Sequence, residues 1–220
     1  MTKIPLYFVP GLAAGPEIFE LLSLAPELYD LHYLQWKMPL HQEETIANYA
    51  MRMCEDIQHK NPVLIGVSFG GIMVQEMSRI ITVKKVIIIS SVKNVDEIPK
   101  KLKLANFMKV YKIFPLNIVA NIETYAAFFL SKSVKKKIES YKKYLYVNDS
   151  NYLTWSIYNV LNWKGVHDTD NELVHIHGTK DTIFPLINIS NSIEIEGGTH
   201  IMILKKAKTI TKHIHESLTF

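Results

Sequence analysis

Four short apolar segments constrain the fold most strongly, because their length and spacing suit only a few architectures. They are nearly continuous in hydrophobic residues and span residues 6–9, 63–67, 86–89 and 173–176. Runs of this kind predict strands that are buried on both faces, as in a parallel sheet. The segments between them carry apolar residues at helical spacing, so strands and helices alternate along the chain. The sequence therefore predicts an α/β fold in which helices cover both faces of a parallel sheet.

Two further segments predict edge strands, because they mix polar and apolar residues. Polar side chains interrupt the apolar pattern in residues 29–36, and isoleucine alternates with glutamate in residues 192–196. With about six strands in all, the spatial order 2-1-3-4-5-6, numbered along the chain, places both of these segments at the sheet edges. Helices are expected at residues 18–25, 46–57, 72–81 and 203–214.

The middle of the chain differs from the rest in composition. Between Lys93 and Lys143 there are 12 lysines and four acidic residues, whereas the whole chain has 25 basic and 21 acidic residues. Residues 93–165 contain no convincing buried strand, and some of their apolar residues recur at helical spacing. We therefore expect a core formed by residues 1–92 and 166–220, and a helical insertion formed by residues 93–165.

A Gly-x-Ser-x-Gly motif, formed by Gly66, Ser68 and Gly70, joins an expected strand to an expected helix. A turn sharp enough to present a serine hydroxyl at the end of a strand leaves no space for side chains at the two glycine positions. The start of the helix also directs free backbone N–H groups at negative charge beside the serine. In the alternative interpretation the serine only caps the helix. The motif favours a nucleophile, because the chain also supplies a base and an acid in suitable places.

The candidate base is His200, after the last expected strand, and the candidate acid is Asp181, after the strand at residues 173–176. The carboxyl ends of parallel strands lie along one edge of a sheet, so these side chains should converge with Ser68. In the expected order, Ser68 and Asp181 leave strands two places apart, roughly 10 Å, a gap that an imidazole can bridge. The backbone N–H groups of Leu12 and Phe69 are the candidate oxyanion hole.

Other histidines and aspartates are weaker candidates for the base and the acid. Two histidines belong to an expected strand or its end, and two belong to the last helix. Two aspartates precede a strand and should lie at the opposite end of the sheet, and one follows the fourth strand. These alternatives are His175, His177, His213 and His215 for the base, and Asp168, Asp170 and Asp96 for the acid.

With this motif and chain order the sequence resembles the α/β-hydrolase superfamily over nearly its whole length. Ser68 matches the family's nucleophile elbow, Asp181 its acid and His200 its base. The segment 93–165 matches the cap domain that the family inserts after the fourth strand of this core. The resemblance implies an α/β-hydrolase core with a helical cap, and hydrolysis of an ester, thioester or amide through an acyl-enzyme without a cofactor.

The expected cap is rich in aromatic residues. Phe107, Tyr111, Phe128 and Trp155 are the candidate contacts to an apolar acyl group, although most of these rings are expected to pack the cap onto the core. The function expected first is therefore that of a serine hydrolase acting on a small carboxylic ester or thioester. The alternative is a ligand-binding sensor that uses the same pocket with little turnover, and a lyase is a third candidate.

Composition excludes several other classes. Cys54 is the only cysteine, so no intramolecular disulfide forms, which fits a cytoplasmic protein. No apolar run is long enough to span a membrane, and no secretion signal is recognisable. We expect no nucleic-acid partner, no metal and no cofactor. His213 and His215 point to different sides of a helix, and the lysine-rich segment accompanies no nucleic-acid-binding module. No feature of the sequence selects an oligomeric state.

Overall fold

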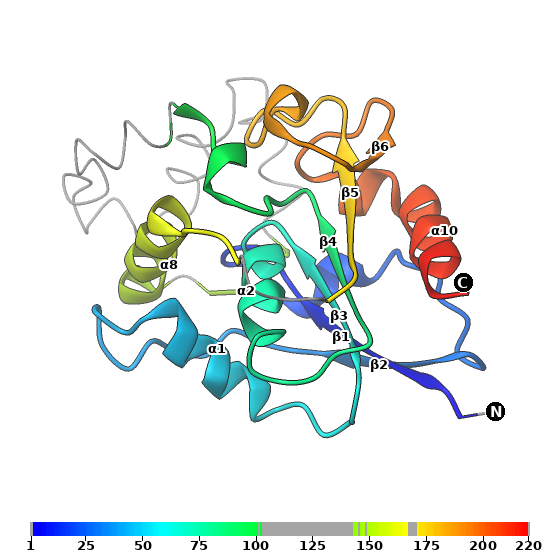
Figure 1. Ribbon diagram of the computed structural model, residues 1–220, viewed down its shortest axis with the longest axis horizontal. Coiled ribbons are helices and arrows are strands. Elements are labelled where there is room, and N and C mark those ends of the chain that lie inside the picture. The colour runs from blue at the N-terminus through cyan, green and yellow to red at the C-terminus, as the bar shows by residue number, and fades with distance from the viewer. Residues whose placement is uncertain are drawn as a thin grey trace.

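The computed structural model describes residues 2–100, 102, 143–144, 146–147, 149–166 and 171–219. Their centre is a six-stranded sheet in which every pair of neighbouring strands is parallel (Figure 1). The spatial order is β2-β1-β3-β4-β5-β6. The strands are β1 Ile4–Val9, β2 Tyr29–Tyr33, β3 Val63–Val67, β4 Lys85–Ile89, β5 Leu173–Gly178 and β6 Ile193–Ile195.

Helices cover both faces of this sheet. The α-helices are α1 Ile46–Cys54, α2 Phe69–Met77, α8 Ser150–Asn162, α9 Met202–Lys205 and α10 Ala207–Leu218. Short 3-10 helices are η1 Pro16–Phe19, η2 Val95–Glu97 and η4 Leu186–Asn188. Figure 1 shows α1, α2 and α8 on one side of the sheet and α10 on the other. Among the described residues, no helix combines the length and apolar character needed to cross a bilayer.

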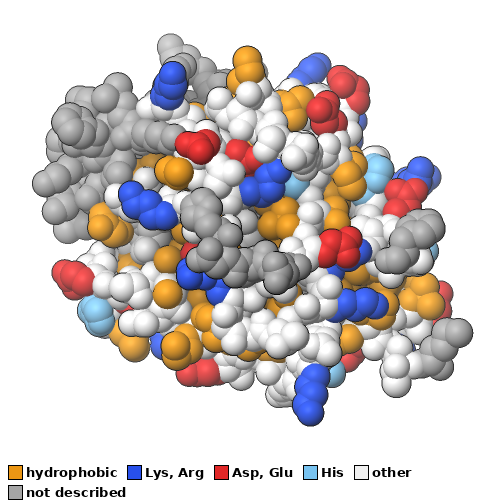
Figure 2. Space-filling model, viewed as in Figure 1, with side chains coloured by type: hydrophobic (Ala, Val, Ile, Leu, Met, Phe, Trp, Pro, Cys, Tyr) orange, Lys and Arg blue, Asp and Glu red, His pale blue; other side chains and the backbone are white. Residues whose placement is uncertain are grey.

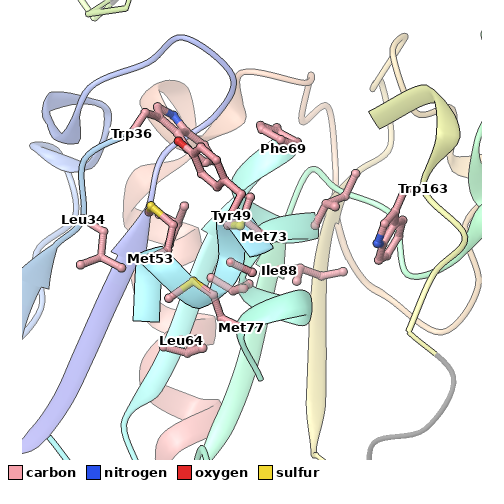
Figure 3. Packing of buried hydrophobic residues seen from close by; sticks show 14 of the residues in the cluster. Leu34, Trp36, Tyr49, Met53, Leu64, Phe69, Met73, Met77, Ile88 and Trp163 are labelled. Carbon is pink, nitrogen blue, oxygen red and sulfur yellow. The ribbon is translucent and has the colours of Figure 1, made fainter. Parts of the chain in front are cut away.

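The core divides into two apolar clusters because strand side chains alternate between the faces of the sheet. In β1, Tyr7 and Val9 face α1 and α2, whereas Leu6 and Phe8 face α9, α10 and η1. Figure 3 shows the first cluster, in which Tyr49 and Met73 pack from the two helices onto the sheet. The central strand β3 is buried at all five positions, which explains why its sequence is continuously apolar.

The predicted strand order and edge strands are confirmed, and the four expected helices differ from the observed ones in their bounds. Helix α1 ends at Cys54 and not at residue 57. Instead of a helix at residues 18–25 there is only η1, whose single turn already buries Ile18 and Phe19. The last helix divides at Lys206, where the backbone turns away from helical angles (φ −120°, ψ 22°). Helix α2 begins at Phe69, directly after Ser68, and not at residue 72.

The expected cap at residues 93–165 lies largely outside the described residues, so its division from the core stays a prediction. Its described part includes α8, which Asp149 caps by accepting hydrogen bonds from the N–H groups of Asn151 and Tyr152. Trp155 of α8 packs into the first cluster and stacks on Tyr49 at 4.2 Å between ring centroids. Helix α8 therefore packs against the first apolar cluster, beside α1.

Surface charge is mixed on the side of the molecule that Figure 2 presents. There, lysine and arginine side chains of the described residues are interspersed with aspartate and glutamate. The described basic side chains on this side therefore form no continuous surface.

Candidate active site

Ser68 occupies a sharp turn between β3 and α2. Its backbone has φ 53° and ψ −118°, a strained conformation for a residue with a side chain. The turn is closed by close backbone approaches at both glycines. A Cβ on Gly66 would lie 2.2 Å from the Gly70 carbonyl oxygen, and a Cβ on Gly70 would lie 2.2 Å from the Val9 carbonyl oxygen. Both positions therefore require glycine, as the motif predicted.

Neighbouring strand ends hold this turn in place. The Ser68 N–H donates to the Ile89 carbonyl at 2.9 Å. The Ser91 hydroxyl donates to the Ser68 carbonyl at 2.7 Å. Both contacts come from the end of β4 and the residues after it, so the strained serine is supported from the adjacent strand.

The structure brings Ser68, His200 and Asp181 together in a continuous hydrogen-bonded chain. Ser68 Oγ lies 2.9 Å from His200 Nε2, and His200 Nδ1 lies 2.9 Å from Asp181 Oδ2. With the Nδ1 proton donated to the carboxylate, Nε2 is left to accept the serine proton. Ser68 is only partly buried, and the His200 side chain is 15% exposed.

Asp181 is buried and held by its own loop. Its Oδ1 accepts hydrogen bonds from the backbone N–H groups of Ile183 and Phe184 at 2.8 and 3.0 Å, which leaves Oδ2 for His200. Burial opposes ionisation, but the neighbouring His200 and the Phe184 N–H together hold the pKa of Asp181 below its usual value. The carboxylate is therefore ionised at neutral pH.

The loop that carries His200 lies directly on the loop that carries Asp181. The Lys180 N–H donates to the Gly198 carbonyl at 2.8 Å, and a Cβ on Gly178 would lie 2.3 Å from that same oxygen. The Phe184 ring and the His200 imidazole pack in a T-shaped arrangement, with 5.4 Å between centroids. These contacts fix the histidine against the acid loop although β6 is only three residues long.

The loop after β1 lies beside the serine, as the oxyanion prediction requires. A Cβ on Gly11 would lie 3.7 Å from the Ser68 Cβ. Phe69 is the first residue of α2, where helical N–H groups lack partners within the helix. Among the hydrogen bonds of the described residues, neither the Leu12 nor the Phe69 N–H is a donor. These two N–H groups therefore remain the candidate oxyanion hole.

Trp36 connects the two candidate oxyanion donors, and the sequence analysis did not identify it. Its indole N–H donates to the Gly11 carbonyl at 2.9 Å, and its ring stacks on Phe69 at 5.1 Å between centroids. The Gly11 carbonyl and the Leu12 N–H belong to one planar trans peptide, so holding one end orients the other. The only sequence signal was a large aromatic residue at the end of an expected edge strand.

Two buried histidines, His175 and His177, lie next to the loop that carries Asp181. His177 Nε2 lies 2.8 Å from the Phe184 carbonyl and 3.7 Å from Asp181 Oδ2, and His177 Nδ1 lies 3.0 Å from His175 Nε2. Burial is the main cause that lowers the pKa of both histidines, for His175 to about 3. Both rings are therefore neutral at pH 7, and neither contacts Ser68.

The remaining described candidates take no part in this chain of hydrogen bonds. His213 contacts Glu216, and His215 contacts the Tyr29 hydroxyl. Asp96 is exposed on η2. Trp155 is fully buried and donates its indole N–H to the Glu44 carbonyl, so its ring packs the core. The candidates outside the described residues are Asp168, Asp170, Phe107, Tyr111 and Phe128.

Comparison with known proteins supports the fold strongly and gives no match by sequence. No family model matches the chain, and no curated protein sequence matches it. The solved structures that it resembles include an esterase from Exiguobacterium antarcticum, which has a TM-score of 0.70 and 15% identity. That match covers 100% of this chain and 93% of the esterase.

Two other solved structures agree with this result. A bromoperoxidase from Bacillus anthracis has a TM-score of 0.70 and 16% identity, over 100% of this chain and 93% of its own. A lipase-esterase related protein from Clostridium acetobutylicum has a TM-score of 0.64 and 18% identity, over 96% and 93%. The chain therefore has the α/β-hydrolase fold, and the expected resemblance to that superfamily is confirmed at the level of the fold.

Proposed function

We propose that the chain is a serine hydrolase that cleaves a small carboxylic ester or thioester through an acyl-enzyme. The observation that carries this proposal is the unbroken chain of hydrogen bonds from the strained, partly buried Ser68 through His200 to the buried Asp181. A fold of this type hosts many functions, so the proposal depends on this site and not on the fold. The esterases among the similar structures are consistent with it.

In the first half of the proposed reaction, Ser68 Oγ attacks the carbonyl carbon of the substrate while His200 Nε2 takes the serine proton. The N–H groups of Leu12 and Phe69 stabilise the negative charge that develops on the carbonyl oxygen. Asp181 remains ionised and stabilises the imidazolium form of His200. The tetrahedral intermediate then collapses, and His200 gives its proton to the departing alkoxide or thiolate.

In the second half, water replaces the leaving group. His200 Nε2 removes a proton from the water as its oxygen attacks the acyl carbon, and the same N–H groups stabilise the second oxyanion. Collapse of this intermediate releases the carboxylic acid and returns the proton from His200 to Ser68. We propose that the cap contacts the acyl group through Phe107, Tyr111 and Phe128. Trp155 instead packs against the ring of Phe69.

We also propose that the protein acts in the cytoplasm. Cys54 is the only cysteine, and burial raises the pKa of its thiol to about 12, so it remains protonated and unreactive. Fractionation of cells that produce the protein would test this: enrichment in the membrane or secreted fraction would contradict it.

The test is steady-state hydrolysis of p-nitrophenyl esters and acyl thioesters of increasing chain length. Wild-type protein should turn over at least one of them at above about 1 s⁻¹. Ser68→Ala should lose several orders of magnitude in kcat while its melting temperature is retained, because the three residues act as a unit. Ser23→Ala, at an exposed serine, is the matched control and should retain full activity.

Two results would contradict the proposal. Ser68→Ala with undiminished activity would remove the serine from the reaction. Negligible turnover of every ester and thioester by folded wild-type protein, together with tight binding of a small ligand, would favour the sensor function instead.

A further inference from the structure

A second group of polar side chains lies at the sheet edge, on β2 and in the segment that leads into β3. Asp30, His32 and His59 each offer one ligand atom, and these atoms lie within 4.8 Å of one another. Asp30 Oδ2 lies 2.8 Å from His32 Nε2 and 3.6 Å from His59 Nε2. In the described part of the chain, this is the one group of three potential metal ligands.

Strand geometry explains how the group forms. Asp30 and His32 are two positions apart on β2, so their side chains project from the same face. His59 joins them from the segment that connects α1 to β3. Tyr7 of β1 is in register with His32 and also with Leu64 of β3. Leu64 is four residues before Ser68, about 13 Å along a strand, so the group is separate from the candidate active site.

A buried tyrosine orients both histidines. The Tyr7 side chain is 1% exposed, and its ring stacks on His32 with 4.6 Å between centroids and an interplanar angle of 14°. Its hydroxyl lies 2.7 Å from His59 Nδ1 and accepts a hydrogen bond from the Gln58 N–H. A fixed partner on one ring nitrogen is how proteins commonly direct the other nitrogen at a metal. Here His59 Nε2 is the nitrogen that faces Asp30.

The spacing and chemistry of the three atoms suit zinc. Bonds of 2.0–2.1 Å to a tetrahedral ion require ligand atoms about 3.3 Å apart. The two measured separations from Asp30 Oδ2, 2.8 and 3.6 Å, lie on either side of that value. Two imidazoles and one carboxylate suit zinc, whereas calcium and magnesium prefer oxygen ligands throughout.

The group is also open on one side. The side chains of Asp30, His32 and His59 are 47%, 32% and 39% exposed. An ion can therefore enter, and water can complete its coordination. We propose that Asp30, His32 and His59 form a zinc site with water as the fourth ligand, which ties the edge strand β2 to the segment before β3. Zinc at this place stabilises the fold, because the ligands converge only in the folded chain.

The experiment uses the full chain without an affinity tag, freed of metal by chelator and dialysis. Titration with zinc chloride in a calorimeter should give a stoichiometry of one ion per chain. Metal analysis of the protein after dialysis should give the same ratio. At zinc concentrations about 100-fold above the dissociation constant, the melting temperature should rise by about 5–10 °C. Cobalt at the same site should give the visible absorption of a tetrahedral ion.

Matched variants locate the ion. His59→Gln and Asp30→Asn should each weaken zinc binding at least tenfold, abolish the cobalt absorption, and keep the circular dichroism of the wild type. His213→Gln is the control, because His213 is also next to a carboxylate, at 3.0 Å from Glu216, but belongs to no group of three ligands among the described residues. His200→Gln serves as the control for zinc bound in the candidate active site.

The outcomes separate the possibilities. Binding that is lost in His59→Gln and Asp30→Asn but retained in both controls supports the site. The proposal is overturned if zinc does not bind below millimolar concentration. It is also overturned if folded His59→Gln binds as tightly as wild type, or if only His200→Gln loses the ion.

Discussion

Trp36→Phe removes one hydrogen bond that orients the candidate oxyanion hole and leaves an aromatic ring in place. The indole N–H holds the Gly11 carbonyl at 2.9 Å, and the Ala14 N–H holds the same oxygen at 3.0 Å. The substitution therefore leaves the Gly11–Leu12 peptide with one of its two anchors. A phenyl ring at position 36 can still pack against Phe69.

The size of the effect follows from the hydrogen bond that is lost. A hydrogen bond contributes about 0.5–1.5 kcal/mol net, which corresponds to roughly a 2- to 13-fold change in rate if it is expressed only in the transition state. Complete removal of an oxyanion donor lowers kcat about 10²–10³-fold, and this is the upper limit for the effect of Trp36→Phe on kcat. We expect kcat to fall about 5- to 10-fold with KM nearly unchanged, because the Leu12 N–H acts on charge that develops during the reaction.

The assay measures kcat and KM on the best aryl ester, together with the melting temperature. Trp163→Phe is the matched control, since the Trp163 indole also donates to a buried acceptor, Glu76 Oε1 at 2.7 Å, but along α2 and away from Ser68. The control should lose at least as much stability, because its acceptor is a carboxylate. It should retain kcat. If Trp36→Phe keeps kcat within twofold, or if both variants lose kcat equally, Trp36 does not position the oxyanion hole.

Three further predictions concern stability. Gly66→Ala should prevent folding, because its Cβ would lie 2.2 Å from a backbone oxygen. Gly11→Ala should melt at the same temperature as wild type, because no heavy atom lies nearer than 3.7 Å to its Cβ. Equal melting temperatures for the two variants would refute this prediction. Glu44→Gln should lower the unfolding free energy by about 1–3 kcal/mol in urea titrations, because the buried carboxylate pairs with Arg52. The exposed Glu43→Gln should change it little, and an equal loss in both would contradict the prediction. The pKa of His175 is about 3 in the folded chain and near its ordinary value in the unfolded chain. Between these two values the histidine takes up a proton when the chain unfolds. The unfolding free energy should therefore decrease as the pH is lowered from about 6.5 to 3. The decline is about 1.4 kcal/mol per pH unit, and His175→Gln should flatten it; an unchanged slope would refute the assignment.

Much of the fold follows from the sequence, because the buried strands record their environment directly. β3 is buried on both faces, so its apolar run and its observed bounds coincide. The edge strands were recognised because one face or one end of each meets water. The segment after Pro16 could not be predicted in the same way. Its helical spacing of apolar residues is real, but one turn of η1 already buries Ile18 and Phe19.

The residues of the candidate site also differ in whether the sequence predicts them. Ser68, Asp181 and His200 could be selected from the sequence, because each follows a strand and strand ends converge at one sheet edge. Trp36 could not, because its role depends on a hydrogen bond to a carbonyl 25 residues away in the chain. The proposed zinc ligands were missed for a related reason. Asp30 and His32 meet His59 only once β2 lies beside β1 in the observed register.

Labelling with a fluorophosphonate, followed by mass spectrometry of the digested protein, tests most directly whether Ser68 is an activated nucleophile. We expect one adduct per chain, on the peptide that contains Ser68, and labelling that is much slower in His200→Ala and Asp181→Asn. An adduct on Ser90 or Ser91, or no adduct on folded protein, would show that the hydrogen-bonded group does not activate this serine.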